Sequence, residues 1–388
     1  MSRQAGTAWL IFGATLALSV GGTLWSFHRA RPSPPRPGLA LGAVLSSGDD
    51  AGFTRALAPR PFVFPADHGP HPDFRSEWWY VTGQVRAGGR RFGYQFTIFR
   101  QALAPVAPAR DSKWASRQIY MGHLALTDVG SGGFVSFERL AREGLGLGGA
   151  QASPLRVWVE DWTMAGQGDP FPLELRAHAV RDDAGQPQAV TLALTLGAGR
   201  GPILQGDRGL SAKGAEPGNA SYYYSMTRLP TRGRITVDGA GLDVEGTSWL
   251  DREWSTSALG AELEGWDWLS LHLADGRDVM VYRLRRRDGR PAAESRATLI
   301  DAGGATRLFT PDAFTLTPTA WWRSPSSGVR YPVSMRLEIP LAGLSLDVRP
   351  LLDDQELRVS VRYWEGAVDA RGPGLEGSGY LELTGYTH

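Results

Sequence analysis

Apolar and polar residues alternate along much of the chain with a period of two, the pattern of strands that are buried on one face. The clearest run is 92–98 (FGYQFTI), in which large apolar side chains occupy every second position and Gly, Gln and Thr lie between them. The run 77–85 (EWWYVTGQV) precedes it, and the segment AGGR at 87–90 separates the two. Glycine pairs between alternating runs favour tight turns, so we expect a β-hairpin here.

A second hairpin is predicted in the C-terminal half. The run 266–273 (WDWLSLHL) is followed by a turn at 274–277 (ADGR) and a returning strand at 278–284. A gapless alignment that places Trp78 on Trp266 also superposes three further pairs of like residues, namely Tyr80 on Trp268, Gly88 on Gly276 and Tyr94 on Tyr282. These coincidences suggest two copies of one β-unit.

Many other runs alternate in the same way, and they predict an all-β fold of two antiparallel β-barrels in tandem. They are 120–127, 155–162, 173–180, 189–196, 222–229, 235–237, 297–300, 333–339, 344–348, 357–363 and 379–384. We place the junction at Thr231-Arg232-Gly233, which gives a first domain at 61–231 and a second at 232–388. Residues 199–218 are expected to form a long loop near a barrel mouth, or an insertion.

The N-terminus differs from the rest in hydropathy. Residues 5–25 contain no charged side chain and are long enough to cross a bilayer, so residues 1–28 are predicted to be a signal peptide or a membrane anchor. No Ala-x-Ala cleavage site follows, which favours the anchor. Residues 29–60 begin with a proline-rich stretch and are predicted to be a linker that holds the next domain off the membrane.

Composition narrows the function classes. The chain of 388 residues carries 41 basic and 40 acidic side chains, a balance that gives no reason to expect nucleic acid as a partner. It contains no cysteine, which excludes disulfides, thiol nucleophiles and thiolate metal sites. Neither a His-Glu-x-x-His helix nor a Gly-x-Ser-x-Gly elbow occurs. We therefore expect no metal, no cofactor and no serine-hydrolase site.

The candidate chemistry concentrates in residues 246–282. Four tryptophans (Trp249, Trp254, Trp266 and Trp268) lie there beside the run Asp251-Arg252-Glu253. Burying such charges is costly unless they pair or face a cavity. The segment is thus either a tryptophan-rich core with a surface ion pair or an apolar pocket walled by ionisable groups. We favour the pocket, the usual composition of a small-molecule site.

Asp251, Glu253 and Arg252 are the candidate catalytic residues. A carboxyl group whose pKa is raised by apolar surroundings could protonate an alkene, and indole faces could stabilise the resulting carbocation. Strand alternation places Asp251 and Glu253 on one face and Arg252 on the other. Because a close cation lowers a carboxyl pKa, a structural clamp between Arg252 and either acid is the competing interpretation.

Further side chains are candidates for binding a ligand. In 266–273, Trp266, Trp268, Ser270 and His272 share a face, so His272 is either a pocket residue or a hydrogen-bonded structural histidine. Glu77 and Glu365 could each be pocket carboxylates, but a structural role is favoured for both. The complete candidate set for ligand binding is Trp249, Trp254, Trp266, Trp268, His272, Tyr282, Glu77, Trp79, Tyr223 and Trp364.

Several tryptophan-rich motifs together resemble the carotenoid 1,2-hydratase (CrtC/AttH-like) family, from about Phe62 to the C-terminus. These motifs are EWWY at 77–80, YYYS at 222–225, SWLDREW at 248–254, GWDW at 265–268 and YWEG at 363–366. The resemblance implies two lipocalin-like barrels and an exported protein that handles an apolar, isoprenoid or lipid-like ligand. The sequence most resembles the family's exported bacterial members that are labelled hydrolases. Some of these are thought to act beside ABC-type permeases.

One position departs from the family pattern. The residue after the motif aspartate is a histidine that matters for activity in the carotenoid hydratases, and here it is Arg252. Arginine stays protonated in proteins and cannot shuttle a proton. The predicted function is a hydratase- or hydrolase-type enzyme that uses pocket carboxylates. The alternative is a non-catalytic lipid carrier beside a permease at the extracytoplasmic face of the membrane.

Overall fold

The computed structural model describes residues 39–40, 50–106, 109, 112, 116–183, 186–257, 259–260 and 262–387. The predicted anchor or signal segment at 1–28 lies outside these residues. Among the residues that are described, no helix combines the length and apolar character needed to cross a bilayer. Contacts divide the chain into Met1–Pro37 and Gly38–His388, and all described residues belong to the second unit.

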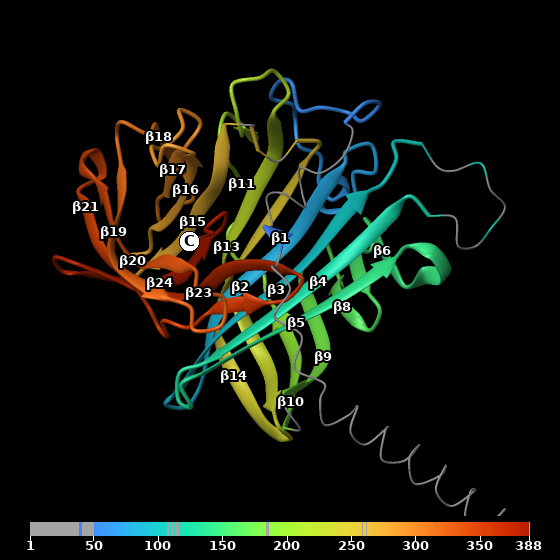
Figure 1. Cartoon of the computed structure of the whole chain (residues 1–388), viewed down its shortest axis with the longest axis horizontal. Helices are drawn as coiled ribbons and strands as arrows, with labels where there is room; N and C mark the ends of the chain where they lie inside the picture. The colour runs from blue at the N-terminus through green and yellow to red at the C-terminus, as the bar shows by residue number, and fades with distance from the viewer. Residues whose placement is uncertain are drawn as a thin grey trace, which may run out of the picture. The chain divides into compact units, whose positions relative to one another are not determined.

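The described part of the chain is built of strands and three 3-10 turns, and it contains no α-helix (Figure 1). The strands form two large sheets that are antiparallel except where Leu39–Ala40 pairs in parallel with Val361–Arg362, and this confirms the predicted all-β fold. The 3-10 turns are Ala66–His68, Gly144–Gly146 and Pro340–Ala342.

The first sheet has 13 strands and coils around one core. Its strands, in spatial order, are β5 (Gly133–Arg142), β4 (Gln118–Asp128), β3 (Arg90–Ala102), β2 (Ser76–Ala87), β14 (Ala240–Ser255), β13 (Ala220–Val237), β10 (Gln186–Leu196), β9 (Leu173–Asp183), β8 (Trp162–Gly166), β7 (Arg156–Val159) and β6 (Gly148–Gln151), with β11 (Ile203–Leu204) and β12 (Leu210–Ala212) also on β13. Because strands from both ends of this order bury side chains in the same cluster, the sheet is a nearly closed barrel.

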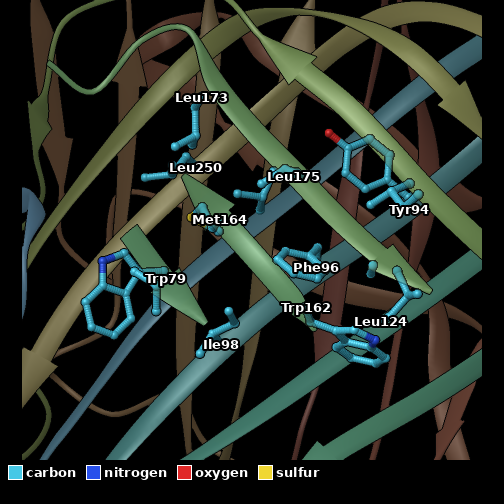
Figure 2. Packing of buried hydrophobic residues seen from close by; sticks show 14 of the residues in the cluster. Trp79, Tyr94, Phe96, Ile98, Leu124, Trp162, Met164, Leu173, Leu175 and Leu250 are labelled. Carbon is cyan, nitrogen blue, oxygen red and sulfur yellow. The ribbon is translucent and has the colours of Figure 1, made fainter. Parts of the chain in front are cut away.

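The predicted first hairpin is β2–β3, and its register pairs Trp79 with Ile98 and Val81 with Phe96. The apolar face expected for 92–98 points into the barrel, where Tyr94, Phe96 and Ile98 pack with Trp162 (Figure 2). Hydrophobic burial on this face is what fixes the register, since a shift of one residue would exchange it with the Gly, Gln and Thr face.

The second sheet has 11 strands. They are β18 (Thr306–Phe309), β17 (Arg296–Ile300), β16 (Asp278–Arg286), β15 (Leu263–Leu273), β24 (Leu375–Leu383), β23 (Val361–Gly372), β21 (Leu344–Pro350), β20 (Arg330–Ile339) and β19 (Thr315–Arg323), with β22 (Glu356–Arg358) and β1 (Leu39–Ala40) also on β23. The predicted second hairpin is β15–β16. Leu269, Leu271 and Leu273 enter the core of this sheet, which leaves Trp266 and Trp268 on its outer face.

The chain passes from the first sheet to the second between Ser255 and Leu263. The junction predicted at Thr231-Arg232-Gly233 lies inside β13, where the residues pair continuously with β14. Local composition suggested a domain junction at residues 231–233 because an aromatic run ends there. The partner strand β14 keeps the segment in the first sheet.

The outer faces of the two sheets pack directly on each other. A third buried cluster joins Tyr80 and Tyr223 of the first sheet to Trp268, Tyr282 and Tyr380 of the second. At Gly93 of β3, a Cβ atom would overlap the Cβ of Ala367 and lie 3.1 Å from the Tyr380 hydroxyl. A glycine at this point is therefore what allows the two sheets to approach closely.

Candidate functional site

A cavity of about 70 Å³ lies in the layer between the two sheets. One water takes ~30 Å³ of liquid volume, so the space suits a small reacting group and is well below the ~300 Å³ that usually holds a whole ligand. Its walls are Trp78, Tyr80, Phe99, Lys213, Tyr223, Asp251, Glu253, Leu259, Trp266, Trp268, Tyr282, Leu284, Tyr363, Glu365 and Glu382. Both halves of the chain contribute, whereas the sequence concentrated the candidate chemistry in residues 246–282.

Strand alternation in β14 decides which of the predicted catalytic residues reach the cavity. Asp251 and Glu253 point outward into it, and both are nearly fully buried. Arg252 and Trp254, which alternate with them, point the other way. The predicted separation of faces is thus correct for this strand.

Asp251 is held by three hydrogen-bond donors. Ser225 Oγ and Trp249 Nε1 donate to Oδ1 at 2.5 and 2.6 Å, and the Tyr223 hydroxyl donates to Oδ2 at 2.5 Å. Burial raises the pKa of Asp251 to about 7, although these three donors act to lower it. Near neutral pH the group therefore exists in both protonation states and can accept or release a proton.

Glu253 is paired with the cation of Lys213. The Lys213 ammonium lies 2.8 Å from Glu253 Oε1, and Ser221 Oγ donates to the same oxygen. The ammonium also lies 4.8 Å from the centre of the Tyr282 ring, a cation–π distance. This pair compensates the buried charge and makes Glu253 part of a fixed wall.

Glu365 and Glu382 are direct cross-strand neighbours on β23 and β24 and face the cavity together. Such pairs have Cβ atoms about 5 Å apart, so two negative charges there would repel strongly. Burial, and then the neighbouring Glu382 carboxyl, hold the pKa of Glu365 well above its usual range. Burial likewise raises the pKa of Glu382 to about 8. At least one of the two is protonated at neutral pH.

The two carboxyl oxygens of Glu365 have different surroundings. Oε1 accepts a hydrogen bond from the Tyr80 hydroxyl at 2.5 Å. Oε2 is buried and has no hydrogen bond of acceptable geometry within the described part of the chain, although the Tyr363 hydroxyl is close enough to lower the pKa of the group. A proton on Glu365 is therefore best placed on Oε2.

The remaining walls are aromatic. Trp268 Nε1 donates to the Tyr223 hydroxyl at 3.0 Å, and Trp266 Nε1 donates to Glu382 Oε1 at 3.1 Å. These bonds use the polar edges of the indoles and fix their orientation. Six of the predicted residues thus meet at one cavity, namely Asp251, Glu253, Trp266, Trp268, Tyr223 and Tyr282.

Arg252 does not lie at the cavity, and it forms a clamp with neither Asp251 nor Glu253. Its guanidinium pairs with Glu77, which also pairs with Arg100, and all three side chains are almost completely buried. The predicted pocket carboxylate Glu77 is therefore structural. Two positive charges flank it, and the pKa of Glu77 stays well below its usual value even though burial alone would raise it.

Trp79 and Trp254 also belong to the interior of the first barrel. The Arg252 guanidinium lies 3.9 Å from the centre of the Trp79 ring, and the His71 ring stacks on Trp254 at 3.8 Å. Figure 2 shows Trp79 near Ile98, its cross-strand partner, in the core. Neither tryptophan is placed to touch a ligand in the cavity.

Trp249 and His272 line a different, open cleft of about 490 Å³ between the sheets. His272 Nδ1 lies 2.9 Å from the buried Asp278 carboxylate, in agreement with a hydrogen-bonded histidine. Trp249 reaches the cavity only through its N–H bond to Asp251. Trp364 points into the second sheet's core, where its Nε1 donates to the Asp353 carbonyl at 2.8 Å.

Sequence reasoning missed several residues of the site. Lys213 lies in the segment predicted to be a long loop, and Glu382 lies in the alternating run 379–384. In that run Leu381 and Leu383 enter the core, so Glu382 necessarily faces outward with Tyr380. The alternation was visible in the sequence, but the second sheet that covers this face was not.

No group of three or more His, Asp or Glu side chains suited to a metal ion occurs within the described ranges. The cavity offers carboxyl, hydroxyl, indole and ammonium groups, and its chemistry is proton transfer next to aromatic faces. The fold and the site together define an all-β protein with opposed carboxyl groups enclosed between two sheets.

Comparison with known proteins gives the family. The AttH-like family model matches residues 55–386, and the chain belongs to this family. It is 38% identical to a protein of Nitrosomonas europaea provisionally named AttH, with a TM-score of 0.73 over 85% of this chain and 100% of the other. Kievitone hydratase from Nectria haematococca is 17% identical, with a TM-score of 0.62 over 87% and 97% of the chains. No curated protein matches the chain.

Proposed function

We propose that this protein is a hydratase-type enzyme that adds water to a carbon–carbon double bond of a small apolar, isoprenoid-like ligand. The observation that carries the proposal is the buried Glu365–Glu382 pair, which keeps a neutral carboxyl group in a cavity walled by indoles. The likeness to kievitone hydratase concerns the fold, so the proposal rests on the side chains of this chain.

In the proposed reaction Glu365 is the general acid. Its proton moves from Oε2 to one alkene carbon, the π electron pair forms the new C–H bond, and the other carbon becomes a cation. The faces of Trp266 and Trp268 stabilise that cation. Water then forms the C–O bond and releases a proton to the Asp251 carboxylate, which lies on the opposite sheet. Asp251 gives this proton to solvent when the product leaves, which restores the carboxylate.

Geometry supports this division of roles. Asp251 and Tyr80 are paired neighbours on β14 and β2, and the Tyr80 hydroxyl reaches across to Glu365. The acid and the base therefore approach the cavity from opposite sheets, so that proton and hydroxide can add to opposite ends of one double bond. Glu253 takes no part in the proton transfer, since it forms a fixed ion pair with Lys213 at the cavity wall.

The test uses prenol and geraniol as probes, since protonation of their double bonds gives tertiary cations. The full chain is incubated with each in ¹⁸O-water, and products are analysed by mass spectrometry for the gain of one labelled water. We expect addition by the wild type and a fall of about 10²–10⁴-fold in Glu365→Gln, the usual contribution of a positioned acid. Glu338→Gln, which removes an exposed carboxyl from the same sheet, is the matched control and should hydrate at the wild-type rate.

Two results would contradict the proposal. The first is hydration that continues unchanged in Glu365→Gln. The second is quenching of tryptophan fluorescence by both probes without any labelled product, which would favour the carrier function instead.

A further inference from the structure

A chain of neighbouring polar side chains leads away from the cavity through the first sheet. We propose that Tyr363, His123 and Glu138 form a proton relay that returns a proton from the surface to Glu365 after each turnover. This inference rests on the proposed function and deepens it, because it assigns a use to one wall residue, Tyr363, and to two groups outside the cavity, His123 and Glu138.

Two of the three links are hydrogen bonds, and at the third the Tyr363 hydroxyl is close enough to Glu365 to act on its pKa. The Tyr363 hydroxyl, on β23 two residues from Glu365, lies 2.8 Å from His123 Nδ1. His123 Nε2, on β4, lies 3.1 Å from Glu138 Oε1 on β5. The relay therefore starts in the second sheet at the cavity and ends in the first sheet.

Exposure increases only at the last member. Tyr363 and His123 are 1% and 0% exposed, whereas the Glu138 side chain is 20% exposed. Glu138 is also held in place, since Ser360 Oγ donates to its Oε1 at 2.6 Å. A proton can therefore enter this chain from water at Glu138.

The surroundings of the relay are apolar. Phe99, Met121, Leu357 and Val361 form one buried cluster with Tyr363, and the Phe99 ring lies 5.3 Å from the His123 ring. Buried polar groups in such a setting are costly unless they bond to one another. A hydrogen-bonded histidine and tyrosine contribute less to packing in an apolar layer than apolar side chains would. A function in proton transfer explains their presence better.

Glu138, which is ionised at neutral pH, first takes a proton from water and passes it to His123 Nε2. His123 releases its Nδ1 proton to the Tyr363 oxygen, and Tyr363 passes its hydroxyl proton to the Glu365 carboxylate. From Glu138 onward, three bonds to hydrogen break and three form, and one proton has moved from Glu138 to Glu365. Rotation of the Tyr363 hydroxyl and exchange of the His123 tautomer reset the chain.

The experiment follows proton exchange and needs no substrate. The full chain is mixed rapidly into D₂O at neutral pH, and the infrared C=O band of protonated Glu365, identified by its loss in Glu365→Gln, is followed as it shifts on deuteration. We expect Tyr363→Phe and His123→Gln to slow this shift at least about tenfold. Glu138→Gln changes only the partly exposed end of the relay and should slow the shift as well. Tyr94→Phe also deletes a buried hydroxyl, here bonded to Ser248 outside the relay, and is the matched control with unchanged exchange.

Equal exchange rates in the wild type and in all three relay variants would overturn the relay, because the proton would then arrive through the cavity. That result leaves the band itself, and thus the proposed acid, in place. Absence of the band in the wild type would contradict the proposed acid and the relay together.

Discussion

The buried Glu77 cluster allows a sharp prediction about stability. Glu77 is 0% exposed and accepts hydrogen bonds from the guanidinium groups of Arg100 and Arg252, which are 1% and 0% exposed. The His71 backbone N–H adds a contact of 3.1 Å to each carboxylate oxygen. Glu77→Gln keeps the shape of the side chain and removes its charge, so that two buried cations lose their shared partner.

Removing one member of a buried ion pair typically costs roughly 3–5 kcal/mol. This is a large part of the ~5–15 kcal/mol that keeps a protein folded. For sheets of this size it corresponds to a fall in Tm of roughly 6–20 °C. The control is Asp243→Asn, which breaks an exposed pair with Arg234 whose side chains are 85% and 55% accessible. That change should cost no more than about 1 kcal/mol.

Urea unfolding followed by tryptophan fluorescence measures both variants. The pH dependence of the unfolding free energy provides a second test. Because the pKa of Glu77 is lowered in the folded state, its contribution is complete above the usual value of 4.5 and is lost as the pH falls below it. The wild type should therefore approach Glu77→Gln at acid pH. A variant within about 1 kcal/mol of the wild type at pH 7 would refute this account of the cluster.

Two further predictions concern the layer between the sheets. Gly93→Ala should destabilise the protein by about 1–3 kcal/mol, because its new methyl group meets Ala367. Gly89→Ala is the control and should have little effect, since the space around Gly89 is open. Equal urea midpoints for the two variants would argue against close contact of the sheets. Asp251→Asn should change the dependence of stability on pH. The Asp251 carboxyl, whose folded pKa is about 7, binds a proton more tightly in the folded than in the unfolded protein. The wild type should therefore lose up to about 4 kcal/mol of unfolding free energy between pH 4 and 7, and the variant should not. Parallel curves of unfolding free energy against pH for the two proteins would disprove the raised pKa.

The strands were predictable because their signal is local. Alternation in 92–98 and 266–273 states which side chains share a face, and the structure has both hairpins where the pattern places them. The alignment of the two hairpins is less exact. Tyr94 points into the first barrel, whereas Tyr282, its counterpart in the alignment, lies outside the second sheet's core at the cavity. Matching residue types did not reveal which face each occupies.

The site was only partly predictable because both faces of its strands are apolar. In β2 the residues Trp78 and Tyr80 face the second sheet, while Trp79 faces the barrel core, and the sequence EWWY gives no sign of the difference. A strand buried on both faces loses the contrast that identifies its interior side. The same ambiguity led to Trp364 being chosen when its neighbour Glu365 reaches the cavity.

Pairings between distant strands could not be read from the sequence at all. Arg252 has two acidic neighbours in the chain, yet its partner is Glu77, which the β2–β14 register brings alongside. Glu365 and Glu382 become neighbours only because β23 and β24 pair. Such contacts depend on the complete sheet order and not on any local pattern.

The central claim is that a neutral carboxyl group stands in the cavity at physiological pH. Infrared titration of protein labelled with ¹³C-glutamate tests it directly, with Glu382→Gln used to separate the two members of the pair. We predict absorption by protonated glutamate C=O groups at pH 7 that loses one component in Glu365→Gln and another in Glu382→Gln. In the wild type it disappears only at more alkaline pH, since the pKa of Glu382 is about 8 and that of Glu365 is also raised. A spectrum showing every glutamate ionised at pH 7 would contradict the account.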